Sequence, residues 1–246
     1  MHPVYVHIKK ELSPFYAEEE ASAMAKWISS DILHLSTLEL YTGKDMNFST
    51  KEWEELEDIL RRLKQREPLQ YILQEASFCG MSFHVEQGVL IPRPETEELV
   101  EWIVSDYREA GKVSILDIGT GSGCIPVSLA QLLPEAQVSS CDVSAEALRI
   151  AAMNVKRYGD KVTLFCADIL KEELPECQVD VLVSNPPYIT ESERTDMEAN
   201  VLDWEPELAL FVPDSDPLRF YRRIARKGLD WLSEGGALYF EINRAY

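Results

Sequence analysis

Three glycines at alternate positions, Gly119, Gly121 and Gly123, separate an apolar strand from an apolar helix, and they constrain the fold strongly. Residues 113–118 are typical of a buried strand, and residues 125–133 are typical of a helix. Glycine adopts positive φ easily and lets a ligand approach the backbone closely. Because a strand, a tight glycine turn and a helix begin a βαβ unit, this segment predicts a parallel sheet with a ligand site at the turn.

Three further apolar runs follow, and each leads into a polar residue. They cover residues 137–141, 162–166 and 179–184. Asp142 ends the first, where a carboxylate can accept both hydroxyls of a ribose, and Asp168 follows the second, where it would face a nucleoside base. Asn185 follows the third. One acid alone would more often be a cap or turn residue. Two acids and an asparagine that follow three successive strands indicate one site at the carboxyl ends of parallel strands.

The chain lacks the usual nucleotide fingerprints at the glycine turn. A dinucleotide motif would need glycine at position 124, where Cys124 stands, and no Gly-Lys-Ser/Thr sequence forms a phosphate loop. By itself the glycine turn is therefore a weak signal, and its spacing to Asp142, 19 residues after Gly123, strengthens it.

The sequence Asn185-Pro186-Pro187-Tyr188 predicts a rigid corner that can grip a planar amino group. Both prolines fix φ and lack an N–H, so nearby carbonyl oxygens stay open as acceptors. Our hypothesis is that the Asn185 side-chain oxygen and the Pro186 carbonyl accept the two N–H groups of a substrate, with Tyr188 packed on its plane. An ordinary proline-rich turn is the alternative.

These motifs resemble known families. Residues 117–123 resemble the first motif of class I S-adenosylmethionine methyltransferases, and residues 185–188 resemble the corner of the members that methylate amino groups. More narrowly, the chain from about residue 10 onward resembles the bacterial release-factor glutamine methyltransferases, the HemK/PrmC family. Further segments carry this match: residues 70–73, 78–80, 91–97, 204–206 and 209–210.

The resemblance implies an activity, a cofactor and a set of site residues. It implies transfer of a methyl group from S-adenosyl-L-methionine, leaving S-adenosyl-L-homocysteine, to the glutamine of the Gly-Gly-Gln motif in peptide chain release factors. The implied catalytic residues are Asn185, Pro186, Pro187 and Tyr188. The implied cofactor-binding residues are Asp117, Gly119, Thr120, Gly121, Ser122, Gly123, Asp142, Asp168, Ile169 and Asn185. Relatives often carry an aromatic residue where Ile169 stands, so apolar contact replaces ring stacking there.

The resemblance also places residues 91–97 over the cofactor pocket. We therefore expect Arg93, Glu95 and Thr96 to close and order the pocket. The alternative is a rigid linker between Pro92 and Pro94, with Thr96 capping a helix that runs to Tyr107.

Composition narrows the range of partners. The formal net charge of −19 argues against nucleic acid as the main partner, because duplex binding depends on phosphate neutralisation. An adenine or guanine methyltransferase, and a cofactor-binding scaffold without catalysis, remain as alternatives.

The five cysteines and four histidines show no metal-ligand spacing, so no metal is expected. Without a signal peptide or membrane span, the sequence predicts a cytoplasmic protein with no membrane partner.

We expect an α/β protein in three parts. Residues 1–75 predict a helical substrate-binding domain, residues 76–111 a β-hairpin and linker helix, and residues 112–246 the catalytic domain, a doubly wound and mainly parallel sheet. In the first part, a helix is expected over residues 17–35, and Ser49 and Glu52 predict a capping box for a helix through Lys64. The hairpin is expected from strands 77–83 and 85–91, with a turn or bulge at Gln87-Gly88.

The carboxyl end suggests an incomplete sheet. Residues 237–242, after a turn at Gly235-Gly236, predict the fifth strand, and only residues 243–246 follow. Members of the family usually add a helix and a final antiparallel pair, which we expect to be absent here. The fifth strand would then be an exposed edge, and we expect the chain to self-associate through it or to be less stable than longer relatives.

Overall fold

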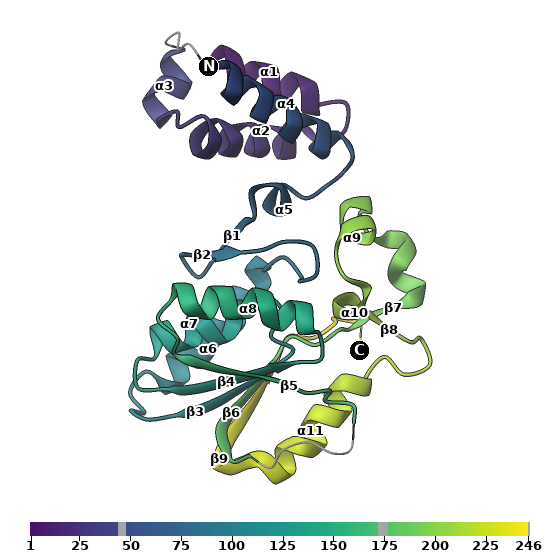
Figure 1. The fold of residues 1–246 in the computed structure, drawn as a ribbon. Helices are drawn as coiled ribbons and strands as arrows, with labels where there is room; N and C mark the ends of the chain where they lie inside the picture. Colours follow the sequence, from purple (N-terminus) through teal and green to yellow (C-terminus); the bar gives the residue numbers. More distant parts are fainter. Residues whose placement is uncertain (44–47, 172–176, 246) are drawn as a thin grey trace. The chain divides into compact units, whose positions relative to one another are not determined.

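The computed structural model describes residues 1–43, 48–171 and 177–245, which belong to two compact units (Figure 1). The units are Met1–Leu73 and Gln74–Tyr246. The β-hairpin and the helix after it belong to the second unit, together with the central sheet. In the described ranges, no helix is both long and apolar enough to cross a lipid bilayer.

The first unit is helical. Its elements are α1 (Pro3–Leu12), α2 (Glu18–Trp27), η1 (Ile28–Ile32), α3 (Thr37–Thr42), α4 (Thr50–Lys64) and α5 (Leu69–Leu73). The predicted capping box is confirmed: the Ser49 N–H donates to Glu52 at 2.7 Å, and the Glu52 N–H donates back to Ser49 Oγ at 3.3 Å. The helix expected over residues 17–35 is shorter, because α2 passes into the π-helical turn η1.

A β-hairpin opens the second unit, but its strands are not the predicted ones. β1 (Glu75–Phe78) pairs antiparallel with β2 (Met81–His84), so the turn consists of Cys79 and Gly80. Both turn residues have positive φ, 49° and 70°, which is the backbone of a type I′ turn and matches the twist of the strands. The expected turn at Gln87-Gly88 therefore lies beyond the hairpin.

The central sheet contains five strands. They are β3 (Ser114–Ile118), β4 (Gln137–Asp142), β5 (Val162–Cys166), β6 (Val179–Ser184) and β9 (Leu232–Phe240). Their order is β5-β4-β3-β6-β9, and every neighbouring pair is parallel. The chain thus starts in the middle of the sheet and winds outward in both directions, which confirms the predicted doubly wound α/β fold.

Helices cover both faces of this sheet (Figure 1). One face packs against α6 (Pro94–Tyr107), α7 (Cys124–Leu132) and α8 (Ala145–Arg157), with Ile115, Val181 and Val183 in that core. The opposite face packs against α11 (Arg219–Trp231) through Leu116 and Leu182. Successive strand residues point to opposite faces, so β3 and β6, apolar along most of their length, can supply both cores.

A small lobe lies between β6 and α11. It consists of β7 (Ile189–Thr190), η2 (Glu191–Asp196), α9 (Ala199–Trp204), α10 (Glu207–Leu210) and β8 (Phe211–Val212). β7 and β8 form a two-residue parallel pair, which brings the start and the end of the lobe together. The lobe therefore begins directly after the Asn185–Tyr188 corner.

β9 is an edge strand of the sheet, but its limits differ from the prediction. It begins at Leu232, so Gly235 and Gly236 lie inside the strand, and its pairing with β6 shifts register near Val179. Gly235 has φ of 81°, which suits such an irregularity. Within the described ranges the five-stranded sheet has no strand beyond β9. Of the four residues expected to follow, Tyr246 lies outside the described residues.

Candidate functional site

An open pocket lies at the carboxyl ends of β3, β4, β5 and β6, with an empty volume of about 1100 Å³ that includes its mouth. Many of the predicted site residues line it. They are Arg93, Thr96, Gly119, Thr120, Gly121, Ser122, Asp142, Asp168, Ile169, Asn185, Pro186 and Pro187. Parallel strands place their carboxyl ends at one edge, which explains why residues far apart in sequence meet there.

The glycine turn forms one wall of the pocket, and its backbone requires glycine. Gly119, Gly121 and Gly123 all have positive φ, from 53° to 85°. At Gly123 a side chain is excluded for a second reason, because a Cβ would lie 3.2 Å from the Cβ of Ala151 in α8. Gly123 therefore acts through helix packing, and it does not itself line the pocket.

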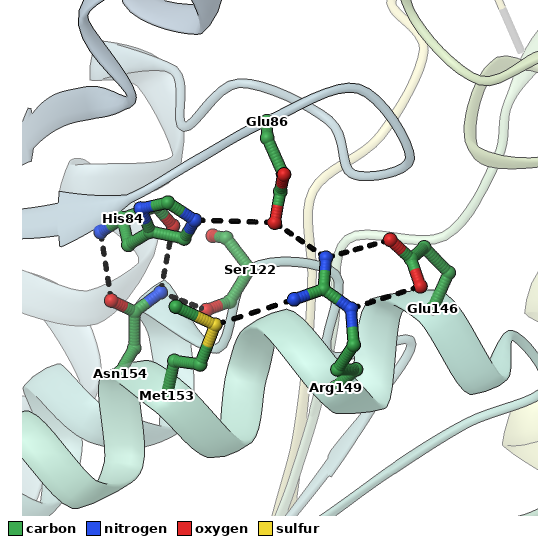
Figure 2. A network of polar contacts seen from close by, with 7 residues as sticks. All are labelled: His84, Glu86, Ser122, Glu146, Arg149, Met153 and Asn154. Atoms are coloured by element: carbon green, nitrogen blue, oxygen red, sulfur yellow. Dashed lines mark hydrogen bonds and ion pairs between the residues drawn. The ribbon is translucent and has the colours of Figure 1, made fainter.

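Asn154 of α8 fixes the glycine turn from behind (Figure 2). Its amide nitrogen donates to the carbonyl oxygen of Ser122 at 2.8 Å and to that of His84 at 2.9 Å. Its amide oxygen accepts the His84 N–H at 2.7 Å. Because Asn154 is fully buried, its three hydrogen bonds are shielded from water. The turn is thereby tied to both α8 and the hairpin.

Asp142 and Asp168 present carboxylates to the pocket while holding their own loops. Asp142 accepts the Gly121 N–H at 3.0 Å and the Ser144 N–H at 2.9 Å. Asp168 accepts the Leu170 N–H at 3.0 Å. Each carboxylate oxygen has a second acceptor direction that these bonds do not use. Beside Asp168, the buried side chain of Ile169 adds an apolar surface to the wall.

Asp117 lies beneath the turn and does not line the pocket. The residue is fully buried, and Oδ2 accepts a hydrogen bond from the Ser140 hydroxyl at 2.5 Å. Oδ1 has no hydrogen-bond partner within the described part of the chain. Burial raises the pKa of this carboxyl to about 7, the Ser140 hydroxyl opposes the rise, and the charge of Asp142 adds to it. Asp117 therefore holds β3 to β4 through Ser140 and is partly protonated near neutral pH.

The Asn185–Tyr188 corner separates this pocket from a second, smaller cavity. Asn185 and Arg93 line both spaces, while Tyr188 lines only the second. The rest of the second wall is apolar. It comprises Leu90, Ile189, Met197, Val201, Ala209 and Leu210. Asn185 is thus one of four residues, with Leu90, Arg93 and Ala209, that line both spaces.

The residues expected to close the pocket divide into two groups. Arg93 and Thr96 line the pocket, whereas Glu95 is exposed and lies outside its lining. The expected helix cap at Thr96 is wrong, because α6 already begins at Pro94 with Arg93 as its N-cap residue. Proline suits the first helical position, so the helix starts two residues before Thr96. Thr96 is instead a buried helical residue whose hydroxyl is free to bond elsewhere.

Two glutamates at the site were not among the predicted residues. Glu205 has a side chain that is 1% exposed; it accepts a hydrogen bond from the Ile91 N–H and pairs with the Arg93 guanidinium. Glu241, after β9, accepts hydrogen bonds from Thr96 and Tyr188. Glu205 lies in residues 204–206, one of the segments that carry the family resemblance. No local motif indicates a role for Glu241, because one acid after an apolar strand is a common pattern.

Family models match both units of the chain. The model described as PrmC N-terminal domain matches residues 5–73, and the model described as Methyltransferase small domain matches residues 96–203. The first match ends at the last residue of the helical unit, and the second contains the glycine turn and the Asn185 corner.

Curated relatives match nearly the whole chain. A release factor glutamine methyltransferase from Bacteroides thetaiotaomicron is 51% identical over 247 residues, with 100% of this chain and 88% of the relative covered. Proteins of the same name from Flavobacterium psychrophilum and Streptococcus pneumoniae are 42% and 41% identical. These two alignments cover 95% and 91% of this chain and 83% and 79% of the relatives.

Proposed function

Because the chain belongs to the release factor glutamine methyltransferase family, we propose that it methylates the side-chain amide nitrogen of a glutamine in peptide chain release factors. The methyl donor would be S-adenosylmethionine, and the acceptor the glutamine of the Gly-Gly-Gln motif. The helical first unit would help to hold the release factor, and we expect the reaction to take place in the cytoplasm.

One observation carries this proposal: Asn185 lines both the large pocket and the second cavity. A transfer reaction needs a donor and an acceptor that meet at one point. Both spaces have mostly apolar walls, and the larger one adds two carboxylates and the glycine turn, which suits a donor that carries a nucleoside. Glutamine has an aliphatic stem and an uncharged amide tip, which fits an apolar cavity with Asn185 at its end.

The residues of the large pocket fit the proposed donor. Asp142 and Asp168 would accept hydrogen bonds from the ribose and the adenine amine, and Ile169 would contact the base. The charge also fits: Asp142 and Asp168 line the pocket, and Arg93, the one cation in the described lining, is paired with Glu205. Outside the lining, Lys171 Nζ lies 3.7 Å from Asp168 Oδ2. An acidic environment favours a ligand with a sulfonium and an ammonium group.

In this methyl transfer the main task of the protein is to position an unreactive amide nitrogen. S-adenosylmethionine, when bound, supplies a methyl group on a sulfonium that is a good leaving group. An amide nitrogen is a poor nucleophile because its lone pair is delocalised into the carbonyl. The Asn185 side-chain oxygen and the Pro186 carbonyl would accept its two N–H groups and orient it. As the N–C bond forms, the C–S bond of the donor breaks, S-adenosylhomocysteine leaves, and one N–H proton is lost to solvent. Tyr188 would pack against the amide plane, and the mechanism requires no metal or covalent intermediate.

The proposal is tested with a radiolabelled methyl donor and three acceptors: a release factor, its Gln→Ala variant at the Gly-Gly-Gln motif, and DNA. Label on the intact release factor alone is the expected result. Asn185→Ala should lower the turnover number by roughly 100-fold or more. Its dissociation constant for the methyl donor should stay nearly unchanged. Label on DNA would favour the nucleic-acid alternative, and binding of the donor without transfer to any acceptor would favour the cofactor-binding scaffold.

Asp142 provides a separate test of the cofactor pocket. Asp142→Ala removes a charged acceptor and should weaken binding of the methyl donor by about 1–3 kcal/mol in calorimetry. Glu146→Ala is a matched control, since that exposed acid of α8 lies outside the lining of both cavities. Equal affinities of the Asp142 variant and the wild type would remove Asp142 from the binding site.

A further inference from the structure

The carboxylate of Glu241 holds two side chains of the candidate site at once, Thr96 of the large pocket and Tyr188 of the second cavity. Its Oε2 accepts the hydroxyl proton of Thr96 at 2.6 Å, and its Oε1 accepts that of Tyr188 at 3.0 Å. The three residues come from different elements: Thr96 from α6, Tyr188 from the corner after β6, and Glu241 from the chain after β9. Glu241 thereby connects three separate segments at the edge of the sheet.

Thr96 passes this constraint on to Asn185. The Asn185 Nδ2 group donates to Thr96 Oγ1 at 3.1 Å. A hydroxyl has a single hydrogen, and an ionised carboxylate can only accept. Because the Thr96 hydrogen points to Glu241, the Thr96 oxygen can only accept from Asn185. Thr96 is 3% exposed, so water does not compete freely for these bonds.

The direction of these bonds decides how the Asn185 amide is turned. Its NH₂ group must face Thr96, which leaves Oδ1 on the other side as an acceptor. With the opposite orientation, the NH₂ group would face the acceptor and two oxygens would confront each other at Thr96. The hydrogen bond from Tyr188 to Glu241 also has a fixed direction, with the Tyr188 hydroxyl as the donor. Burial and the Glu241 charge raise the pKa of Tyr188, which keeps its phenol protonated and donating.

We propose that Glu241 is a positioning residue that sets the orientation of the Asn185 amide through Thr96, so that Oδ1 faces the substrate N–H. This inference rests on the proposed function, since it assigns Glu241 a role in the same transfer. Glu241 lines neither cavity and would touch no reactant. Its effect should therefore appear in the turnover number and not in binding of the methyl donor.

Glu241→Gln tests the proposal directly. A glutamine side chain has one acceptor oxygen and one donor group, so it cannot accept from both Thr96 and Tyr188. The amide can also donate to Thr96, which frees the Thr96 hydrogen to turn toward Asn185. We expect the turnover number on a release factor to fall roughly 10- to 100-fold. The dissociation constant of the methyl donor and the melting temperature should change little.

Asp106→Ala is the control for the connection between α6 and β9. Asp106 of α6 accepts a hydrogen bond from the Tyr239 hydroxyl of β9 at 2.7 Å, so it links the same two regions with the same chemistry. It lies outside the lining of both cavities. A loss of connection between α6 and β9 would affect both variants alike. We expect only Glu241→Gln to reduce turnover.

We call the hydrogen-bonded path Glu241–Thr96–Asn185 the relay. Two substitutions of Thr96 distinguish an effect of this relay from a general loss of packing. Thr96→Val keeps the shape and removes the hydroxyl, whereas Thr96→Ser keeps the hydroxyl, so turnover should fall much further in the valine variant. Adding Glu241→Gln to Thr96→Val should cause little additional loss, because both changes break one path. Independent, multiplicative losses would overturn the relay.

The possible failures are distinguishable. An inactive wild-type protein would contradict the proposed function itself. An active wild type with an equally active Glu241→Gln variant would leave that function intact and overturn the role of Glu241. Should Glu241→Gln fold poorly, the comparison of Thr96→Val with Thr96→Ser still decides the outcome, since equal turnover in these two variants would refute the relay.

Discussion

Among single residues, Asp117 makes the most direct prediction about pH. Burial raises the pKa of its carboxyl to about 7, against about 4 for an unperturbed aspartate. The folded state then binds more protons than the unfolded state between these values, so the stability contributed by Asp117 falls as pH rises from about 4 to about 7. Each unit of pKa shift corresponds to about 1.4 kcal/mol, so the effect is measurable.

Asp117→Asn removes this titration without changing the shape of the side chain. The melting temperature of the variant relative to that of the wild type should increase between pH 5 and pH 8, measured without ligand. Parallel pH profiles for the two proteins would contradict the buried charge.

The residues that the sequence identified at this scale are those whose chemistry is visible locally. Glycines at 119, 121 and 123 need positive φ, and Asp142 and Asp168 lie at the ends of apolar strands, so their places at the sheet edge follow from pattern alone. Glu205 and Glu241 act through partners more than 100 residues away in the chain, Arg93 and Thr96. No local pattern reveals such pairings, which only the folded chain brings together.

At the scale of elements, the Arg93–Glu205 pair fixes the segment before α6 to the small lobe. Glu205 is almost fully buried, and burial raises its pKa while the Arg93 charge opposes the rise. Truncating one partner of a buried pair leaves the other charge without compensation, which costs about 3 kcal/mol or more. The structure therefore adds a structural role to the expectation that Arg93 closes and orders the pocket.

Arg93→Ala should lower the free energy of unfolding by about 3 kcal/mol, while Arg93→Ala combined with Glu205→Gln should lower it less. Denaturant titration measures both values, and Arg226→Ala on the exposed face of α11 serves as the control. Equal destabilisation by the single and double variants would show that the buried charge is not the cause.

The elements predicted well are the apolar runs with clear limits. The prediction for β6 was correct because residues 179–184 form a mostly apolar run, as a strand buried on both faces requires, that ends at the Asn185 corner. The hairpin was misplaced, because two glycine-containing turns, at Gly80 and Gly88, lie close together and only tertiary pairing selects the first. The lobe between β6 and α11 is built of very short elements, which have too few residues to show a period.

At the scale of the whole molecule, we expect self-association through the edge of the sheet formed by β9. β9 is an edge strand, and unpaired backbone groups on an edge can pair with a second chain. The average mass measured by light scattering should therefore rise with protein concentration over the micromolar range. A constant monomer mass over that range would contradict the prediction.

The division into a helical unit and a sheet unit was foreseeable, because the two halves differ in hydrophobic period. The identity of the acceptor could not be predicted from the site residues, because an amide and an aromatic amine both present a planar NH₂ group. The family relationship supplies that choice.

Mass spectrometry of the acceptor tests the proposed activity most directly. A release factor is incubated with this protein and S-adenosylmethionine, digested, and the peptide that contains Gly-Gly-Gln is fragmented. We predict one added methyl group on the side-chain amide of that glutamine, and none when Asn185→Ala replaces the wild type. An unmodified glutamine, with the methyl donor shown to bind, would contradict the assignment.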